Sequence, residues 1–208
     1  MISGISIAVT KPSSTDSTTR RLLGGLLLTL VAGASCASEW NVTELMRVLA
    51  LTKEGRASFV EKKYIGIVDK PLVSSGELAF TAPDRLEKRT VKPTPEALLL
   101  DGESLVIEQA DKRRLSVRLQ EHPEVAAFVE SIRGTLAGDR LALEKVFALE
   151  LSGSMERWQL VLTPTQARMS RLISRIRIGG TQGEVKAISF EQADGDRSEM
   201  AITKVLAK

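Results

Sequence analysis

The stretch Gly76–Pro93, GELAFTAPDRLEKRTVKP, decides the fold because it holds two strands of opposite character around one turn. In its first half the apolar Leu78 and Phe80 alternate with polar side chains, which predicts a half-buried β-strand. Ala82-Pro83-Asp84 then predicts a tight turn. The second half carries an unusual number of charged residues for a strand that pairs with an apolar one.

Side chains along a strand point alternately to the two faces of a sheet. The alternation places one charged set on the face that we expect to meet solvent: Arg85, Glu87 and Arg89. It places the other set on the opposite face: Leu86, Lys88 and Thr90. Lys88 therefore lies on the same face as an apolar neighbour, where a buried ammonium group needs an anionic partner.

The remaining sequence repeats the strand pattern on both sides of one helical insert. Residues 56–69 alternate and are rich in β-branched and aromatic side chains, which predicts a long strand. Three short strands follow in residues 96–119, and further strands resume at Phe147. Pairs such as Asp101-Gly102 and Asp194-Gly195 are typical of hairpin turns. Together with the two strands of the opening stretch this predicts about eleven antiparallel strands.

Helical spacing appears at three places. Residues 40–52 predict a first helix, and residues 139–145 predict a short third one after Gly138. Between them Pro123 stands where the first helical residue is expected. Apolar side chains then recur at i, i+3, i+4, i+7 and i+11: Val125, Phe128, Val129, Ile132 and Leu136. The fold class is mainly β (α+β), with one large curved sheet and helices over a single face.

The N-terminal segment has the parts of a secretory signal peptide. Arg20-Arg21 precede a short apolar run, and Ser35-Cys36-Ala37 fits the small-residue cleavage rule. We expect a signal peptide over residues 1–37, a single domain over 38–208 and a location in the periplasm. Two alternatives remain: a lipid anchor on Cys36, and twin-arginine export signalled by Thr19-Arg20-Arg21.

Composition restricts the classes of function. The chain has a net charge of +3, and residues 1–37 hold three basic and one acidic side chain, so the remainder is close to neutral. We therefore expect no nucleic-acid partner. Cys36 is the sole cysteine, so the exported part relies on its core without a disulfide.

Catalytic chemistry has few candidates. His122 is the sole histidine, and it stands at the start of a predicted helix. The sequence shows no His and Cys spacing for a transition metal, and Asp194-Gly195-Asp196 lacks the ligand spacing of a calcium loop. We expect no catalytic residues, no metal, no cofactor and no enzymatic activity.

A series of short motifs then points to a family. They are F-x-E at Phe59–Glu61, the G-E-L-x-F-x-x-P-D-R-L run at Gly76–Leu86, DG-x-x-L at Asp101–Leu105, L-x-L-x-P-T at Leu160–Thr165, and a final hairpin at Gln192–Met200. In this order and spacing the chain resembles the periplasmic outer-membrane lipoprotein carriers of the LolA family. The resemblance covers nearly all of the chain after residue 37.

The resemblance implies an incomplete antiparallel β-barrel of the LolA, LolB and RseB type, with helices packed into its mouth as a lid. It also implies that the concave apolar face shelters acyl chains between an inner-membrane donor and an outer-membrane acceptor. Exposing an acyl chain to water costs about 0.8 kcal/mol per CH₂ group, so such a cargo needs an escort. One departure concerns the lid: Ala82 occupies the position of the family's latch arginine, and Arg85 follows three residues later.

The predicted site combines these patterns. The predicted cargo cavity is lined by Leu78, Phe80, Leu86, Lys88, Leu98, Leu100, Leu115 and Val117. The predicted lid residues are Val125, Phe128, Val129, Ile132 and Leu136, with Arg85 as a further lid or headgroup contact. An anionic headgroup would supply the partner that Lys88 needs.

The leading hypothesis is a monomeric periplasmic carrier of a lipoprotein or of another acylated or polyene-like amphiphile. The missing latch arginine favours an acylated or polyene-like amphiphile over a lipoprotein as the cargo. The alternative is a sensor or adaptor of the same fold that recognises an envelope protein through the cavity or a sheet edge. An enzyme acting on a lipid or glycan is a third reading, for which the sequence offers no nucleophile.

Overall fold

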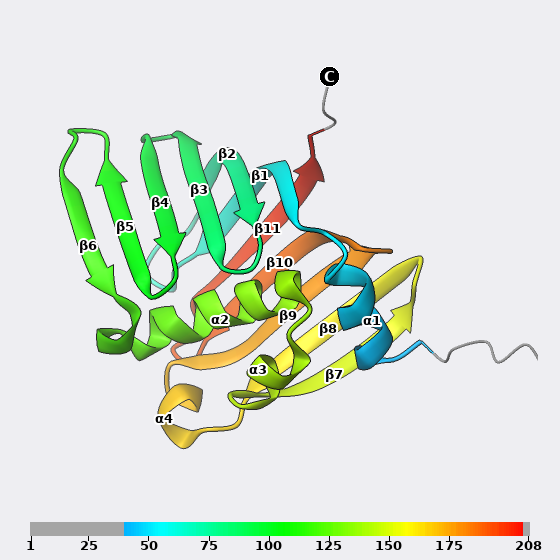
Figure 1. Cartoon of the computed structure of the whole chain (residues 1–208). Coiled ribbons are helices and arrows are strands. Elements are labelled where there is room, and N and C mark those ends of the chain that lie inside the picture. The colour runs from blue at the N-terminus through cyan, green and yellow to red at the C-terminus, as the bar shows by residue number, and fades with distance from the viewer. Residues whose placement is uncertain (1–39, 206–208) are drawn as a thin grey trace, which may run out of the picture. The chain divides into compact units, whose positions relative to one another are not determined.

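Eleven antiparallel strands form one twisted sheet in the computed structural model, which describes residues 40–205 (Figure 1). The strands are β1 (Glu54–Tyr64), β2 (Leu72–Thr81), β3 (Arg85–Lys92), β4 (Glu96–Asp101), β5 (Ser104–Gln109), β6 (Arg114–Arg118), β7 (Phe147–Ser154), β8 (Arg157–Pro164), β9 (Ile173–Thr181), β10 (Glu184–Gln192) and β11 (Arg197–Lys204). Their order is β6-β5-β4-β3-β2-β1-β11-β10-β9-β8-β7. The strands β6 and β7 are the two edges of this order, so the sheet is not closed. The predicted fold class is confirmed.

Helices lie on one side of this sheet. They are α1 (Val42–Leu49), a 3₁₀ turn (Leu119–Glu121), α2 (Pro123–Ala137), α3 (Arg140–Glu144) and α4 (Ala167–Ser170). The three predicted helices are confirmed. No helix was predicted at α4, whose Met169 is buried against the core. A four-residue helix is too short to show helical periodicity in the sequence.

The first strand is also shorter than predicted. β1 ends at Tyr64, and residues 65–71 form the turn to β2. Gly66 and Pro71, which lie in this turn, are typical strand breakers. The predicted signal peptide over 1–37 and its alternatives at Cys36 and Thr19–Arg21 lie outside the described residues.

Side-chain caps fix where the helices begin and end. The Asn41 carboxamide oxygen accepts a hydrogen bond of 3.1 Å from the backbone N–H of Glu44, and the Asp139 carboxylate accepts one of 2.9 Å from Ala142. Gly138 ends α2 with a φ of 70°, a conformation that favours glycine. A Cβ atom at Gly138 would lie 2.2 Å from the carbonyl oxygen of Met46. The glycine therefore lets the corner between α2 and α3 approach α1 closely.

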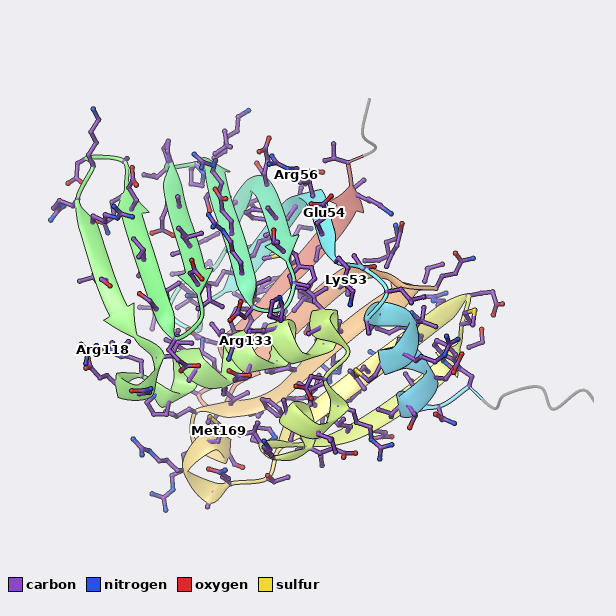
Figure 2. All side chains as sticks on the ribbon, viewed as in Figure 1. Lys53, Glu54, Arg56, Arg118, Arg133 and Met169 are labelled. Carbon is purple, nitrogen blue, oxygen red and sulfur yellow. The ribbon has the colours of Figure 1, made fainter. Side chains whose placement is uncertain are left out.

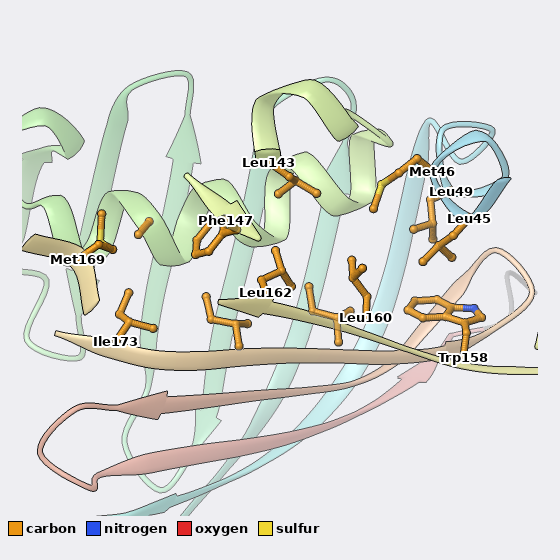
Figure 3. Packing of buried hydrophobic residues seen from close by; sticks show 13 residues of the cluster. Leu45, Met46, Leu49, Leu143, Phe147, Trp158, Leu160, Leu162, Met169 and Ile173 are labelled. Atoms are coloured by element: carbon orange, nitrogen blue, oxygen red, sulfur yellow. The ribbon is translucent and has the colours of Figure 1, made fainter. Parts of the chain in front are cut away.

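The hydrophobic core is concentrated over one half of the sheet. Figure 3 shows the larger cluster between the helices and the strands β7 to β9. Its buried members are Leu45, Met46, Leu49, Ala127, Leu143, Phe147, Trp158, Leu160, Leu162, Met169, Ile173, Ile176 and Ile178. The other half has a second, smaller cluster formed by Leu100, Leu119 and Val129. The half built from β2 to β6 is therefore less completely filled by the protein's own side chains.

Gly76 on β2 allows β2 and β3 to approach closely. A Cβ atom there would lie 1.9 Å from the carbonyl oxygen of Arg89, far inside contact distance. We predict that Gly76→Ala lowers the free energy of unfolding by about 2 kcal/mol, measured by urea denaturation, because the backbone of β3 must move. Gly55→Ala is the matched control, since no atom lies within 4 Å of its added Cβ. Equal stability of the two variants would contradict this prediction.

Candidate functional site

The strand register places all eight predicted cavity residues on one face of the sheet. That face is covered by α2, because Val125, Ala126 and Val129 of α2 contact Leu86, Leu100 and Leu105. We call it the helix face, and the opposite one the far face. Across β2 to β6 the residues of the helix face form successive rows, which differ in chemistry.

The first row lies under α2 and is apolar. It consists of the paired residues Phe80, Leu86, Leu100, Leu105 and Val117. Phe80 and Leu100 are buried, and the other three are half-buried. This row lies beneath α2.

The second row is apolar except for one residue, and it is more open. It consists of Leu78, Lys88, Leu98, Ile107 and Leu115. Leu115 at the edge of the sheet is 59% exposed. The others are half-buried, so a strip of leucine and isoleucine side chains lies between the covered first row and solvent.

The third row is polar and borders a groove of about 490 Å³. It consists of Gly76, Thr90, Glu96 and Gln109. The groove is also lined by Glu61, Ser74, Lys88, Asp111 and Arg113, among other residues. The helix face thus changes from apolar under the helix to hydrogen-bonding at its open end.

Lys88 has an anionic partner within the chain. Its ammonium group lies 2.5 Å from a carboxylate oxygen of Glu61 and 5.0 Å from the centre of the Phe59 ring. Both ionised side chains are mostly buried, with 26% and 16% of their surface exposed. An anionic headgroup is therefore not required to compensate Lys88, and it would have to compete with Glu61.

The charges of the groove are nearly balanced. Asp111 and Arg113 form an exposed ion pair with 2.5 Å between nitrogen and oxygen. Glu96 has no ion-pair partner among residues 40–205. The groove therefore offers a carboxylate, hydroxyl groups and an amide, a set that suits a polar headgroup with hydrogen-bond donors.

The predicted lid residues occupy α2, but they contact different parts of the protein. Val125 and Val129 cover the first row, while Ile132 packs against the larger core cluster. The Phe128 ring meets Phe190 of β10 edge-on, with 5.1 Å between the ring centres. Leu136 is half-buried. The helix therefore bridges the two halves of the sheet instead of lying over one of them.

Arg133 joins α2 to the turn between β4 and β5. One guanidinium nitrogen donates a hydrogen bond of 2.9 Å to the carbonyl oxygen of Gly102, and the other contacts the carboxylates of Glu103 and Glu130. Only 16% of the Arg133 side chain is exposed. Sequence reasoning missed this residue, because its partners on the sheet, Gly102 and Glu103, lie 31 and 30 positions away in the chain.

Arg85 lies on the far face, where it lines a charged groove of about 220 Å³ with Glu87, Arg89 and Arg114. The Glu87 carboxylate accepts a hydrogen bond of 2.7 Å from Arg89 and thereby raises the pKa of that guanidinium. The strand alternation that puts Leu86 under the lid points Arg85 away from it. The expectation that Arg85 contacts the lid is corrected by this register.

Other expected features can be placed as well. Within residues 40–205 no group of three or more His, Cys, Asp or Glu side chains is arranged to hold a metal ion. In the same part of the chain, no helix combines the length and the apolar character needed to cross a bilayer.

Comparison with known proteins gives a family. The family model described as "Outer membrane lipoprotein carrier protein LolA-like" matches residues 30–205. The chain belongs to this LolA-like family. The resemblance stated from the sequence motifs is thereby confirmed.

Relatives of this LolA-like chain include two proteins named outer-membrane lipoprotein carrier protein. The one from Dechloromonas aromatica is 26% identical over 86% of this chain and 81% of its own length. The one from Ralstonia nicotianae is 24% identical over 89% of this chain and 86% of its own length. Among solved structures, a LolA superfamily protein from Nitrosomonas europaea covers 81% of this chain and 95% of its own, at 7% identity and a TM-score of 0.42.

In this LolA-like protein the residue before Pro83 is Ala82, so the latch arginine that the resemblance implies is absent from this position. The arginine that joins the helix to the sheet here lies on the helix: Arg133 of α2 contacts Gly102 and Glu103 of the β4–β5 turn. The guanidinium group therefore fixes α2 against the β4–β5 turn near the end of the first row.

We predict that Arg133→Met loosens α2 without unfolding the protein. Hydrogen bonds to charged groups contribute about 1.5–3 kcal/mol each, and the partial exposure of the Arg133 side chain lowers this contribution. Without these bonds the backbone amides of α2 should exchange about tenfold faster. Hydrogen–deuterium exchange measured by mass spectrometry tests this. The control is Arg118→Met, since Arg118 is exposed at the end of β6, before α2 begins (Figure 2). Unchanged exchange in α2 would show that Arg133 does not hold the helix.

Proposed function

We propose that this LolA-like protein is a periplasmic carrier, which shelters the acyl chain of a lipoprotein or of another amphiphile for transfer towards the outer membrane. One observation carries the proposal: the helix face changes from two mainly apolar rows under and beside α2 to a polar groove. That gradient matches the two parts of an amphiphile. The acyl chain would lie along the first and second rows, and the headgroup would lie in the groove.

The energetics support binding of this kind. Each CH₂ group removed from water contributes about 0.8 kcal/mol, and the second row offers half-buried Leu78, Leu98 and Ile107 as apolar contacts. Arg133 holds α2 to the β4–β5 turn over the first row. We infer that the lid opens by releasing this contact and that the cargo then enters between α2 and the second row.

The groove suggests the kind of headgroup. Its lining carries Lys88 and Arg113 against Glu61, Glu96 and Asp111, so it has no excess of positive charge. We infer a headgroup that donates hydrogen bonds to Glu96 and its neighbours. In this account the protein binds and releases its cargo as a monomer without catalysing a reaction, and it receives and delivers the cargo through membrane partners.

The experiment is a titration with a dansyl-labelled fatty acid, whose fluorescence rises in an apolar site. We expect saturable binding with one probe per chain and displacement by unlabelled amphiphiles. Binding that does not saturate, or that unlabelled amphiphiles do not displace, would contradict the proposal.

A second candidate is a sensor or adaptor that recognises an envelope protein. The observation that favours it is the free edge strand β6, which carries the exposed Arg114 and Arg118. An edge strand can pair with an extended peptide. A stable protein partner recovered from envelope extract, together with no amphiphile binding, would favour this candidate over the carrier.

A further inference from the structure

The turn between β1 and β2 exposes apolar side chains at its tip. Ile67 is 95% exposed, and its neighbour Val68 is 42% exposed. Leu72 and Val73, the first residues of β2, are 53% and 52% exposed. Four exposed apolar side chains therefore lie within residues 67–73, a local concentration that is typical of interaction sites.

The tip is held in a defined conformation. The backbone N–H of Gly66 donates a hydrogen bond of 2.9 Å to the carboxylate of Asp196, which lies in the turn between β10 and β11. The N–H of Val68 donates one of 2.9 Å to the carbonyl oxygen of Ile65. The Arg197 guanidinium lies 3.9 Å from the centre of the Tyr64 ring. Ile67 is therefore presented outwards by a supported turn.

On the hairpin segment itself the exposed charges are mainly basic: Lys62, Lys63 and Lys70, against Asp69. The adjoining turn between β10 and β11 adds two acidic residues, Asp194 and Asp196. Apolar side chains with a collar of lysines suit the interface of an anionic bilayer, where the apolar groups enter the headgroup layer and the ammonium groups meet phosphates. A few side chains on a convex turn offer much less area than a stable protein interface, which needs roughly 800 Å² per partner.

The tip also lies beside the polar groove. Glu61 and Ser74 line the groove and are paired across β1 and β2. Two positions further along the same strands, Lys63 pairs with Leu72 at the base of the tip. A membrane that held the tip would therefore face the open end of the groove.

We propose that the β1–β2 tip, residues 65–73 with Lys62 and Lys63, is a docking element that inserts Ile67 into the surface of an anionic phospholipid bilayer. Docking by this tip brings the mouth of the groove to the membrane. The significance of that placement rests on the proposed carrier function, whereas the docking itself does not depend on any cargo.

The test is flotation of the purified protein with vesicles of phosphatidylethanolamine and phosphatidylglycerol, compared with vesicles of phosphatidylcholine. We expect binding to the anionic vesicles, and Ile67→Asp should weaken it about tenfold. Val60→Asp is the matched control, because Val60 is an exposed residue of β1 away from the tip, and its binding should stay within about twofold of the parent. Changing Lys62, Lys63 and Lys70 together to glutamine should remove the preference for anionic vesicles.

Several outcomes would overturn the docking proposal. One is that the parent protein does not bind anionic vesicles. Another is that Ile67→Asp and Val60→Asp lose vesicle binding equally. The third is that the protein binds an envelope protein through Ile67 and does not bind lipid. Titration with the dansyl-labelled fatty acid tests the carrier proposal independently of membrane docking. Ile67→Asp should bind the probe as the parent does, and vesicle binding without probe binding would leave docking supported and the carrier function refuted.

Discussion

Leu98→Asp is expected to weaken binding of the dansyl-labelled fatty acid by about 100-fold, which corresponds to about 2.8 kcal/mol. Leu98 lies in the middle of the second row, between Lys88 on β3 and Ile107 on β5. An aspartate there removes apolar contact area and places a carboxylate against the acyl chain. That carboxylate loses its water when the cargo binds, and no apolar group can replace the lost hydrogen bonds.

The neighbouring residue provides a matched control. Leu99 is also half-buried on β4, but it lies on the far face, where it pairs with Glu87 and Val106. Leu99→Asp introduces the same charge on the same strand, and we expect binding within about threefold of the parent protein. Thermal unfolding of both variants checks that each is folded. Equal loss of affinity in the two variants would show that the cargo does not lie on the helix face.

Leu162→Ala is expected to lower the free energy of unfolding by about 3 kcal/mol, measured by urea denaturation. Leu162 of β8 is fully buried in the larger core cluster, so its truncation leaves an unfilled volume. Leu98→Ala removes the same atoms from the second row, where the side chain is only half-buried. We expect it to cost about 1 kcal/mol or less, because less apolar surface is lost from contact.

The difference between these two variants tests how the core is distributed. A carrier needs one half of its sheet filled by protein for stability and the other half available to cargo. If Leu98→Ala destabilised the protein as much as Leu162→Ala does, the second row would be occupied by the protein's own side chains. The proposed path of the acyl chain would then be wrong.

Alternation along the strands predicted the membership of the helix face correctly. In the opening stretch it separated Leu86 and Lys88 from Arg85 and Arg89, and the pairing of β2, β3 and β4 has this arrangement. Local signals also located α2, because Pro123 and Gly138 mark its two ends. These features depend on neighbours in the sequence, which is why one sequence was enough to predict them.

Features that depend on distant residues were not predictable in the same way. Glu61, the partner of Lys88, lies two strands away, and the pairing register was needed to bring the two together. The contact of Arg133 with the β4–β5 turn likewise depends on how α2 crosses the sheet. Ile107 belongs to the second row and was missed as a site residue, although the alternation in residues 104–109 could have identified it.

The central claim is that this LolA-like protein carries an amphiphile on the helix face. Native mass spectrometry of the protein, purified gently from the cells that produce it, tests this claim most directly. The account predicts a bound species of one acylated or similarly amphiphilic molecule per protein chain, absent from the Leu98→Asp variant and present in Leu99→Asp. Protein that carries no such molecule, or the same molecule retained in both variants, would contradict the account.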